Sequence, residues 1–272
     1  MGIARYVHSV DSAMARLISY MAPGFPESLF ELIGDAIGAT VEYETEMSGP
    51  APGTDPFADS GAEFGWVCST SFVDLATRGS DPSVQLVGVA WVPDDPDSAG
   101  RPVYFGDLVT RPGSEVSSIN DLRGLRIGCN DVVSLSGHYA LRFALDDAGI
   151  SVDEVELVFT GGHHSSIDMM LAGDLDVAVV DSVVRTGRAR LDPNVAALTV
   201  VERLGPWPVQ PLVARSTLDP EQMATARRLL VEASDTPAMQ AELDAAALSH
   251  FVEVGPDHYA PVRTAMDRIG AL

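Results

Sequence analysis

The chain has 272 residues, enough for one large domain or two modest ones. Its formal net charge at pH 7 is −22, from 39 acidic and 17 basic residues, and every basic residue is Arg because the sequence contains no Lys. Without Lys, Schiff-base chemistry, pyridoxal phosphate and a P-loop are excluded. The excess of negative charge and the scattered arginines argue against nucleic-acid binding.

The N-terminus and the cysteines bear on location. The first 20 residues contain no apolar stretch followed by a cleavage site, and no segment has the length of a transmembrane helix. The sequence as it stands therefore predicts a cytoplasmic protein, or an extracytoplasmic one if a leader has been removed. Cys68 and Cys129 lie in unrelated segments, so we expect two buried thiols rather than a disulfide.

Short β-branched runs alternate with amphipathic helices from residue 15 onward, which is typical of an α/β fold with a mainly parallel sheet. Pro26 suits the start of a helix and Gly38 its end. The expected elements of this first unit are a strand at 15–20, a helix between Pro26 and Gly38, a strand at 40–45, a loop at 49–59, a strand at 63–67, a helix at 71–77 and a strand at 84–92.

A second unit begins with a predicted strand at residues 103–110. Its further expected elements are a short helix capped by Ser118, a strand at 125–129, a helix at 137–148, a strand at 156–159, a helix at 166–172, and strands at 177–180 and 198–202. A Pro-rich crossing, a strand at 212–215 and a largely helical tail from residue 219 follow. The crossings near Tyr104 and Trp207 are candidate hinges, so the middle unit forms one lobe and both chain ends share the other.

The most informative string is Asn-Asp-Val-Val-Ser-Leu-Ser-Gly at residues 130–137, between a predicted strand and a predicted helix. Its two hydroxyls and its glycine place free backbone N–H groups at a helix N-terminus. The partial positive charge there favours an oxyanion without Lys or Arg. Capping of the helix by Ser136 is the alternative role.

Two further strings also follow predicted strands. Residues 159–166, Phe-Thr-Gly-Gly-His-His-Ser-Ser, open a helix, and the adjacent His163 and His164 cannot both face one point from it. No further ligands lie nearby at chelating spacing, so no metal site is expected. Asp181 ends a predicted buried strand, at the edge where α/β sheets bind ligands. Hydrogen-bonding caps are the alternative roles of His163 and Asp181.

Together these strings resemble a known family. The runs S-S-I-N-D-L-R-G-L-R-I-G, N-D-x-x-S-x-S-G and T-G-G-H-x-x-S-I, the last followed by L-A-G-D-L-D-V-A-V-V-D-S, are similar to the phosphonate/phosphite/phosphate substrate-binding proteins of ABC transporters. Residues 65–75, 101–111 and 204–211 extend the resemblance to nearly the whole chain beyond the first dozen residues. It implies a two-lobed type II periplasmic-binding-protein-like α/β fold, with residues 1–106 and 206–272 in lobe one and 107–205 in lobe two.

Carried over to this sequence, the resemblance implies an oxyanion clamp formed by Ser134, Ser136 and the backbone N–H groups around Leu135 and Gly137. Two positions depart from the family pattern. Phe72 stands where the family often has a Tyr, and His164 where an acidic or amide residue is common.

The resemblance also assigns roles to side chains outside the clamp. Tyr104 would approach from the crossing, His163 would donate to a ligand oxygen, and Asp181 would accept from a protonated oxygen or a ligand ammonium. The weaker candidates for walls of the cleft are Tyr20, Ser69 and Trp207.

The sequence therefore predicts a solute-binding protein that closes by hinge motion around a small anionic ligand of the phosphonate, phosphite or phosphate class. We expect a monomer that needs no cofactor or metal and binds no nucleic acid, with an ABC permease as its partner. The alternative is a cytosolic lyase, hydrolase or synthase with the same fold, in which Cys68, His163, His164 and Asp181 supply acid, base or nucleophile. A cytosolic ligand sensor is the third reading.

Overall fold

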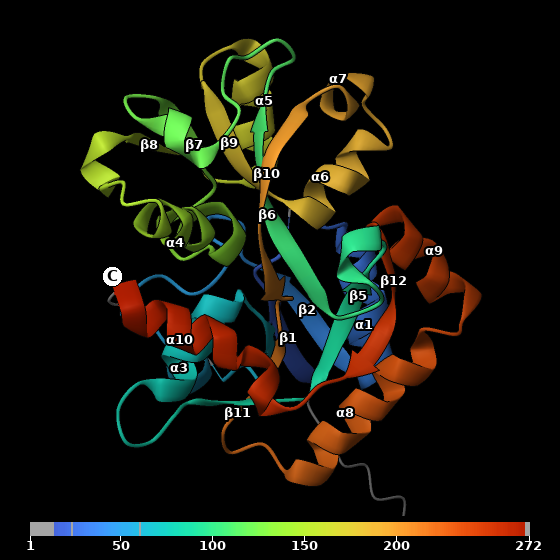
Figure 1. Ribbon diagram of the computed structural model, residues 1–272. Coiled ribbons are helices and arrows are strands. Elements are labelled where there is room, and N and C mark those ends of the chain that lie inside the picture. The colour runs from blue at the N-terminus through green and yellow to red at the C-terminus, as the bar shows by residue number, and fades with distance from the viewer. Residues whose placement is uncertain (1–13, 23, 60, 270–272) are drawn as a thin grey trace, which may run out of the picture.

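The computed structural model describes residues 14–22, 24–59 and 61–269, and it folds into two lobes (Figure 1). The first lobe is built on a five-stranded sheet of order β2-β1-β3-β11-β4. In this sheet β1 pairs in parallel with β2 and β3, whereas β11 runs antiparallel to β3 and β4. Its strands are β1 (Ala15–Ser19), β2 (Ala39–Tyr43), β3 (Phe64–Trp66), β4 (Val84–Leu86) and β11 (Leu212–Arg215).

The second lobe is built on another five-stranded sheet, of order β10-β6-β9-β7-β8. Here β7 pairs in parallel with β8 and β9, and β6 runs antiparallel to β9 and β10. Its strands are β6 (Val103–Thr110), β7 (Arg126–Cys129), β8 (Glu156–Phe159), β9 (Val177–Asp181) and β10 (Thr199–Pro208). The mixed α/β architecture predicted from the sequence is confirmed.

Helices cover both sheets (Figure 1). Those of the first lobe are α1 (Glu27–Ile37), α2 (Pro56–Asp59), α3 (Ser69–Thr77), α8 (Pro220–Ala233), α9 (Pro237–Ala245) and α10 (Ala260–Ile269). Those of the second lobe are α4 (Ala140–Asp147), α5 (His163–Ala172), α6 (Ser182–Ala189) and α7 (Pro193–Ala196). The short turns are η1 (Pro96–Ser98), η2 (Ile119–Leu122), the π-helical η3 (Leu135–Tyr139), η4 (Val152–Glu154) and η5 (Pro256–Tyr259). No helix within the described ranges combines the length and apolar character needed to span a membrane.

Several predicted elements differ from the structure. The loop expected at 49–59 ends in helix α2, and the strand expected at 198–202 continues through the Pro-rich crossing as β10. The strand expected at residues 84–92 is broken, because Gly88 takes a positive φ of 88° and turns the chain between β4 and β5 (Val89–Pro93). Strand β5 leaves the first sheet and pairs with β12 (Leu248–Glu253), which interrupts the tail that was expected to be largely helical. Helical periodicity in the tail gave no sign of a strand whose only partner lies more than 150 residues away.

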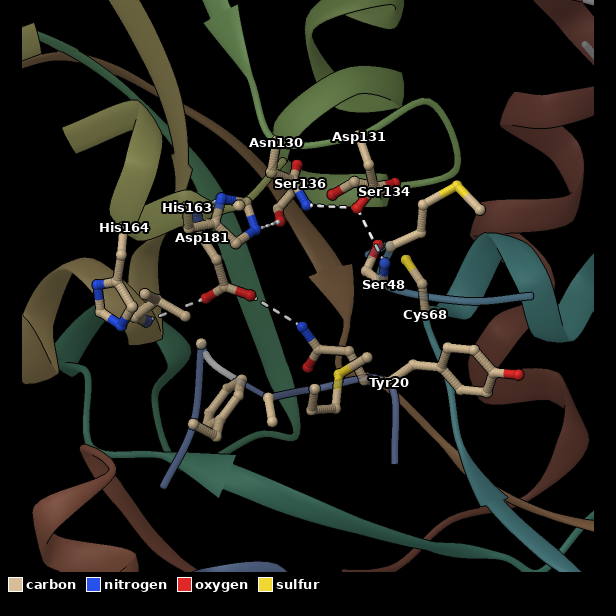
Figure 2. Close-up of a pocket in the computed structure, with 18 of the residues that line it drawn as sticks. Tyr20, Ser48, Cys68, Asn130, Asp131, Ser134, Ser136, His163, His164 and Asp181 are labelled. Carbon is tan, nitrogen blue, oxygen red and sulfur yellow. Dashed lines mark hydrogen bonds between the residues drawn. The ribbon is translucent and has the colours of Figure 1, made fainter. Parts of the chain in front are cut away.

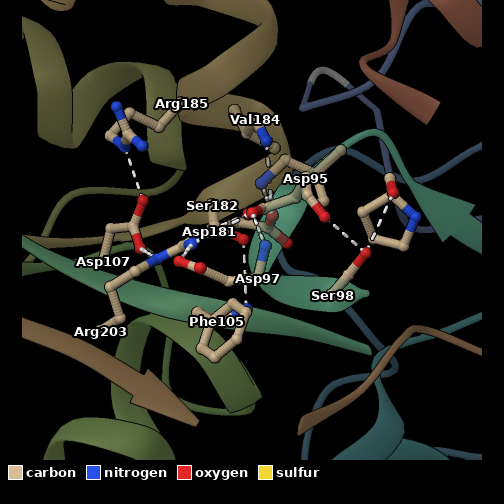
Figure 3. Close-up of polar contacts among 12 residues, drawn as sticks. Asp95, Asp97, Ser98, Phe105, Asp107, Asp181, Ser182, Val184, Arg185 and Arg203 are labelled. Atoms are coloured by element: carbon tan, nitrogen blue, oxygen red, sulfur yellow. Dashed lines mark hydrogen bonds and ion pairs between the residues drawn. The ribbon is translucent and has the colours of Figure 1, made fainter. Parts of the chain in front are cut away.

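Two long antiparallel strands, β6 and β10, join the lobes (Figure 1). The fully buried carboxylate of Asp107 on β6 accepts hydrogen bonds from Arg203 Nε at 2.9 Å and Arg185 Nε at 2.6 Å (Figure 3). Arg203 also pairs with Asp95 and lies 4.2 Å above the Phe105 ring. A buried carboxylate is costly unless its oxygens are paired. The paired Asp107 therefore holds β6 against β10 and α6 where the strands cross between the lobes. The lobe boundaries predicted at 106/107 and 205/206 fall inside these strands and stay predictions.

The largest hydrophobic core belongs to the first lobe but extends across the interface. It contains the stacked rings of Trp66 and Trp91, whose centroids lie 4.4 Å apart. Leu135 and Phe143 from the second lobe are part of the same core. The two lobes therefore bury apolar surface against each other in addition to sharing two strands.

Candidate functional site

A small cavity lies between the lobes (Figure 2). It is lined by segments that follow β1, β2 and β3 in the first lobe and β7, β8 and β9 in the second. Both sheets therefore turn the carboxyl ends of their parallel strands toward it, which is where ligands bind in α/β folds. Its volume is about 50 Å³, well below the roughly 300–1,000 Å³ of drug-sized ligand pockets.

The turn after β7 supplies hydroxyl and backbone groups at the start of η3. Ser134 Oγ accepts from Gly137 N at 3.2 Å, so Ser134 rather than Ser136 is the side chain that caps this turn. Ser136 is also buried, and its Oγ lies 3.5 Å from His163 Nε2 (Figure 2). The capping role considered for Ser136 is wrong, and its hydroxyl lines the cavity instead.

His163, the first residue of α5, presents a neutral ring to the cavity. Its Nδ1 accepts from the backbone N–H of Asp181 at 3.3 Å. The ring proton of the neutral form therefore lies on Nε2, the nitrogen beside Ser136. Burial, helped by His164, lowers the pKa of His163 to about 3. At neutral pH the ring is thus an uncharged hydrogen-bond donor.

Asp181 both caps helix α6 and lines the cavity between the lobes. Its Oδ1 accepts from Val183 N at 2.8 Å and Val184 N at 3.3 Å, capping α6. Its Oδ2 accepts from Gln210 Nε2 of the first lobe at 2.8 Å. Burial, aided by the charge of Asp107, raises the pKa of Asp181 to about 7 in spite of these hydrogen bonds. Asp181 can therefore hold a proton near neutral pH.

The two predicted tyrosines differ. Tyr104 on β6 is fully buried at the cavity, and burial raises its pKa well above the ordinary value, so it stays a hydroxyl. Tyr20 also lines the cavity, but Figure 2 shows its hydroxyl pointing away from Asp181 and His163. Burial raises the pKa of Tyr20 to about 12, helped by the nearby charges of Glu44 and Asp55.

Contacts between the lobes surround the cavity. Ser48 N donates to Asp131 Oδ2 at 2.9 Å, and Leu135 N donates to Cys68 Sγ at 3.1 Å. The hydrogen bond from Gln210 Nε2 to Asp181 Oδ2 also joins the lobes at the cavity. Each of these hydrogen bonds joins a second-lobe group to a first-lobe group. The two lobes are therefore in direct contact around the cavity.

Four predicted residues do not line the cavity. Ser69 Oγ donates to the carbonyls of Pro208 and Val209, both at 3.0 Å. Leu135 belongs to the apolar core, and the Trp207 ring packs against Phe143 at 5.2 Å. The fourth residue, Gly137, leaves no room for a side chain, since a Cβ there would lie 1.9 Å from Asn130 Oδ1.

Several polar residues that line the cavity escaped sequence reasoning as ligand-binding positions. Asn130 and Asp131 stood in the most informative string, and the only available signal was their place at a strand end. Nothing local marks three others, Ser48, Cys68 and Gln210, as neighbours of this string. Asn130 Oδ1 and Gln210 Oε1 are buried and have no hydrogen-bond partner among the described residues. Unpaired buried acceptors of this kind are costly unless a ligand donates to them.

The electrostatics of the cavity are unusual for an anion site. Within the described part of the chain no Arg lines it, whereas two buried carboxylates, Asp131 and Asp181, do. Burial raises the pKa of Asp131 as well. The described residues hold no group of three or more His, Cys, Asp or Glu side chains placed for a metal ion. Both cysteines are buried and free, as predicted, and burial raises the pKa of the Cys68 thiol at the cavity wall.

Comparison with known protein families identifies the family of this chain. The model of the family described as "ABC transporter, phosphonate, periplasmic substrate-binding protein" matches residues 27–259. The chain belongs to this family. Membership implies that it binds a small ligand outside the cytoplasmic membrane and works with a permease. It supports the binding-protein reading over the enzyme alternative.

Solved structures of low sequence identity share the fold of this substrate-binding protein. The binding component of a phosphonate ABC transporter from Pseudomonas aeruginosa has a TM-score of 0.74 and 15% identity, covering 92% of this chain and 84% of that one. PhnD1 from Prochlorococcus marinus in complex with methylphosphonate has a TM-score of 0.72 and 14% identity, covering 94% and 97%. The aliphatic sulphonate-binding protein SsuA from Escherichia coli has a TM-score of 0.58 and 12% identity, covering 94% and 91%.

Proposed function

We propose that the cavity between the lobes binds a small, partly protonated oxyanion of the phosphonate, phosphite or phosphate class for delivery to an ABC permease. The observation that carries this proposal is the neutral donor set at the start of two helical elements. His163 Nε2 and Ser136 Oγ lie together there, 3.5 Å apart, with the N-terminus of η3 beside them. Preorganised neutral donors and helix N-termini stabilise an oxyanion without a cation.

Buried acceptors support a ligand that carries its own protons. Asp181 Oδ2 and the unpaired oxygens of Asn130 and Gln210 belong to residues of the same cavity as the donors. A fully deprotonated dianion would repel Asp181 and leave these oxygens unsatisfied. A monoprotonated phosphonate, or one with an ammonium group, supplies donors to match. The small volume of the cavity favours a head group with few additional atoms.

The chemistry of Cys68 does not favour catalysis. Its thiol accepts from Leu135 N at 3.1 Å, and burial keeps its pKa above the ordinary value. A nucleophilic cysteine requires the opposite shift and a neighbouring base or cation. We therefore infer a monomeric binding protein that acts outside the cytoplasmic membrane and returns its ligand unchanged.

A ligand screen tests this function. Phosphite, phosphate, methylphosphonate, 2-aminoethylphosphonate and methanesulfonate are added separately, and the melting temperature is measured. At least one should raise it, because a ligand that binds only the folded state stabilises by mass action. The same ligand should reduce the radius of gyration in solution scattering and be recovered intact after incubation. Failure of every oxyanion to bind would remove the ligand class, and a converted product would remove the transport role.

A further inference from the structure

An acidic pocket lies beside the cavity between the lobes, which is called the first cavity from here on. The volume of the pocket is about 320 Å³, and its wall comes from the first-lobe segments that follow β1 and β2 and lead into α2. Three carboxylates lie on this wall, those of Glu44, Glu46 and Asp55. Tyr20 and Met47 line both the pocket and the first cavity. The acidic pocket is therefore the immediate neighbour of the first cavity.

The carboxylates of the acidic pocket have no cation opposite them. Within the described part of the chain no Arg lines the pocket, and the exposed Glu44 and Glu46 form no ion pair. Arg78 comes near, since it donates to the carbonyl of Thr54 on the wall at 3.0 Å, but its charge is paired with Asp74. The pocket therefore keeps its full negative charge and attracts a cation.

Tyr20 supplies a polar group that faces the acidic pocket. The residue is only 9% exposed, and its hydroxyl has no hydrogen-bond partner among the described residues. Figure 2 shows this hydroxyl directed away from Asp181 and His163. Burial and the charges of Glu44 and Asp55, which line the pocket, raise its pKa. A nearly buried hydroxyl of this kind gains a partner when a ligand enters the pocket.

An ammonium group matches the chemistry of the pocket. It carries a positive charge and N–H donors only, and the carboxylates and the Tyr20 oxygen are acceptors for it. The described residues hold no group of three or more His, Cys, Asp or Glu side chains placed for a metal ion, which favours an organic cation. Exposed carboxylates bind a free cation weakly. A cation attached to a head group in the first cavity is held there at a high effective concentration.

We propose that the acidic pocket is a subsite for the ammonium end of a ligand whose oxyanion head lies in the first cavity. The ligand is then a phosphonate with an aminoalkyl chain long enough to pass Tyr20 and Met47. A short chain leaves its ammonium in the first cavity beside Asp181 and gains nothing from the acidic pocket. The position of the head rests on the proposed function, whereas the cation subsite does not.

Two matched pairs of phosphonates test the subsite. Butylphosphonate is compared with 4-aminobutylphosphonate, and ethylphosphonate with 2-aminoethylphosphonate, by calorimetric titration at neutral pH and low ionic strength. The amine should lower the dissociation constant roughly threefold to tenfold in the butyl pair and less than about twofold in the ethyl pair. A gain confined to the ethyl pair would place the ammonium in the first cavity and overturn the subsite.

Variants assign the gain to the pocket. Glu44→Gln combined with Asp55→Asn removes two charges at constant size, and Asn can cap α2 as Asp55 does. The difference within the butyl pair should fall below about twofold in this variant, and Tyr20→Phe should reduce it in part. Glu115→Gln combined with Asp153→Asn removes the same charge from exposed second-lobe positions and should leave the difference unchanged. An equal difference in wild type and the pocket double variant would overturn the assignment.

A cation without a head group separates the subsite from the proposed function. Met47 lines the acidic pocket and the first cavity, whereas Met21 lines only the first cavity of the two. In protein labelled with ¹³C at the methionine methyls, n-butylammonium should shift the Met47 signal saturably in the millimolar range and leave Met21 nearly unchanged, and neutral 1-butanol should shift neither. Absence of a Met47 shift would overturn the subsite. If no phosphonate binds but n-butylammonium still shifts Met47, the proposed function is at fault and the cation subsite stands.

Discussion

The two walls of the first cavity are built differently. The second-lobe wall presents side chains held at the starts of helical elements. Ser134, Ser136 and Asp181 are buried, His163 is half-buried, and each has a hydrogen bond within its own lobe. The first-lobe wall reaches across with single groups, such as the amide of Gln210 and the backbone N–H of Ser48. The second-lobe wall is thus preorganised for the proposed oxyanion, and the first lobe supplies single contacts across the interface.

The largest expected effect concerns the buried acid of the second-lobe wall. The pKa of Asp181 is raised from 3.8 to about 7 on folding. Its protonation therefore stabilises the fold fully below pH 3.8, and this stability is lost as pH rises to about 7. Over that window the free energy of unfolding should fall by up to about 1.4 kcal/mol per pH unit relative to Asp181→Asn. Denaturant titrations of both proteins at several pH values measure the difference. The same pH dependence of the free energy of unfolding in both proteins would contradict the prediction.

The next largest effect is expected on ligand affinity, when the hydroxyls of both Ser134 and Ser136 are removed. Ser134→Ala combined with Ser136→Ala is expected to reduce oxyanion affinity by about 1–3 kcal/mol. Ser134→Ala alone should also cost about 1 kcal/mol of stability, since it removes the cap of η3, whereas Ser136→Ala should not. Calorimetric titration gives the affinity, with the exposed Ser114→Ala as the control. Unchanged affinity in the double variant would leave both serines with structural roles only.

The adjacent histidines offer a sharper comparison. His163 faces Ser136 in the cavity, so His163→Ala should weaken binding by about 1 kcal/mol, the usual worth of one neutral hydrogen bond. His164→Ala is the matched variant and should change affinity less than twofold. Both are compared with the same ligand. A larger effect at His164 would reverse the assignment and reopen an acid/base role.

The smallest affinity change is expected on the first-lobe wall. Gln210→Ala removes the amide that contacts Asp181 across the interface, and should weaken binding by roughly 0.5–1 kcal/mol. Its clearer signature is geometric, because the liganded variant should keep a larger radius of gyration than liganded wild type. An affinity loss equal to that of the serine double variant would show that the first lobe binds the head group as strongly as the second.

The sequence predicted the elements of the second lobe better than the contacts between lobes. Strand ends are visible as β-branched runs followed by Gly, Ser or Asp, so His163 and Asp181 could be placed at one sheet edge. The partnership of Gln210 with Asp181 depends on how β6 and β10 cross, which no local pattern encodes. Ser69 is the reverse case, since the family resemblance suggested a wall position but its hydroxyl donates to backbone carbonyls.

The missing cation at the cavity has a kinetic consequence. Cation-lined anion sites attract their ligands over long range, but this chain carries a net charge of −22 and places no Arg on the described wall of the first cavity. An incoming oxyanion is therefore repelled until it meets the neutral donors at contact distance. Added salt screens the repulsion over a Debye length of about 8 Å at physiological ionic strength. Association should consequently become faster, not slower, as ionic strength rises.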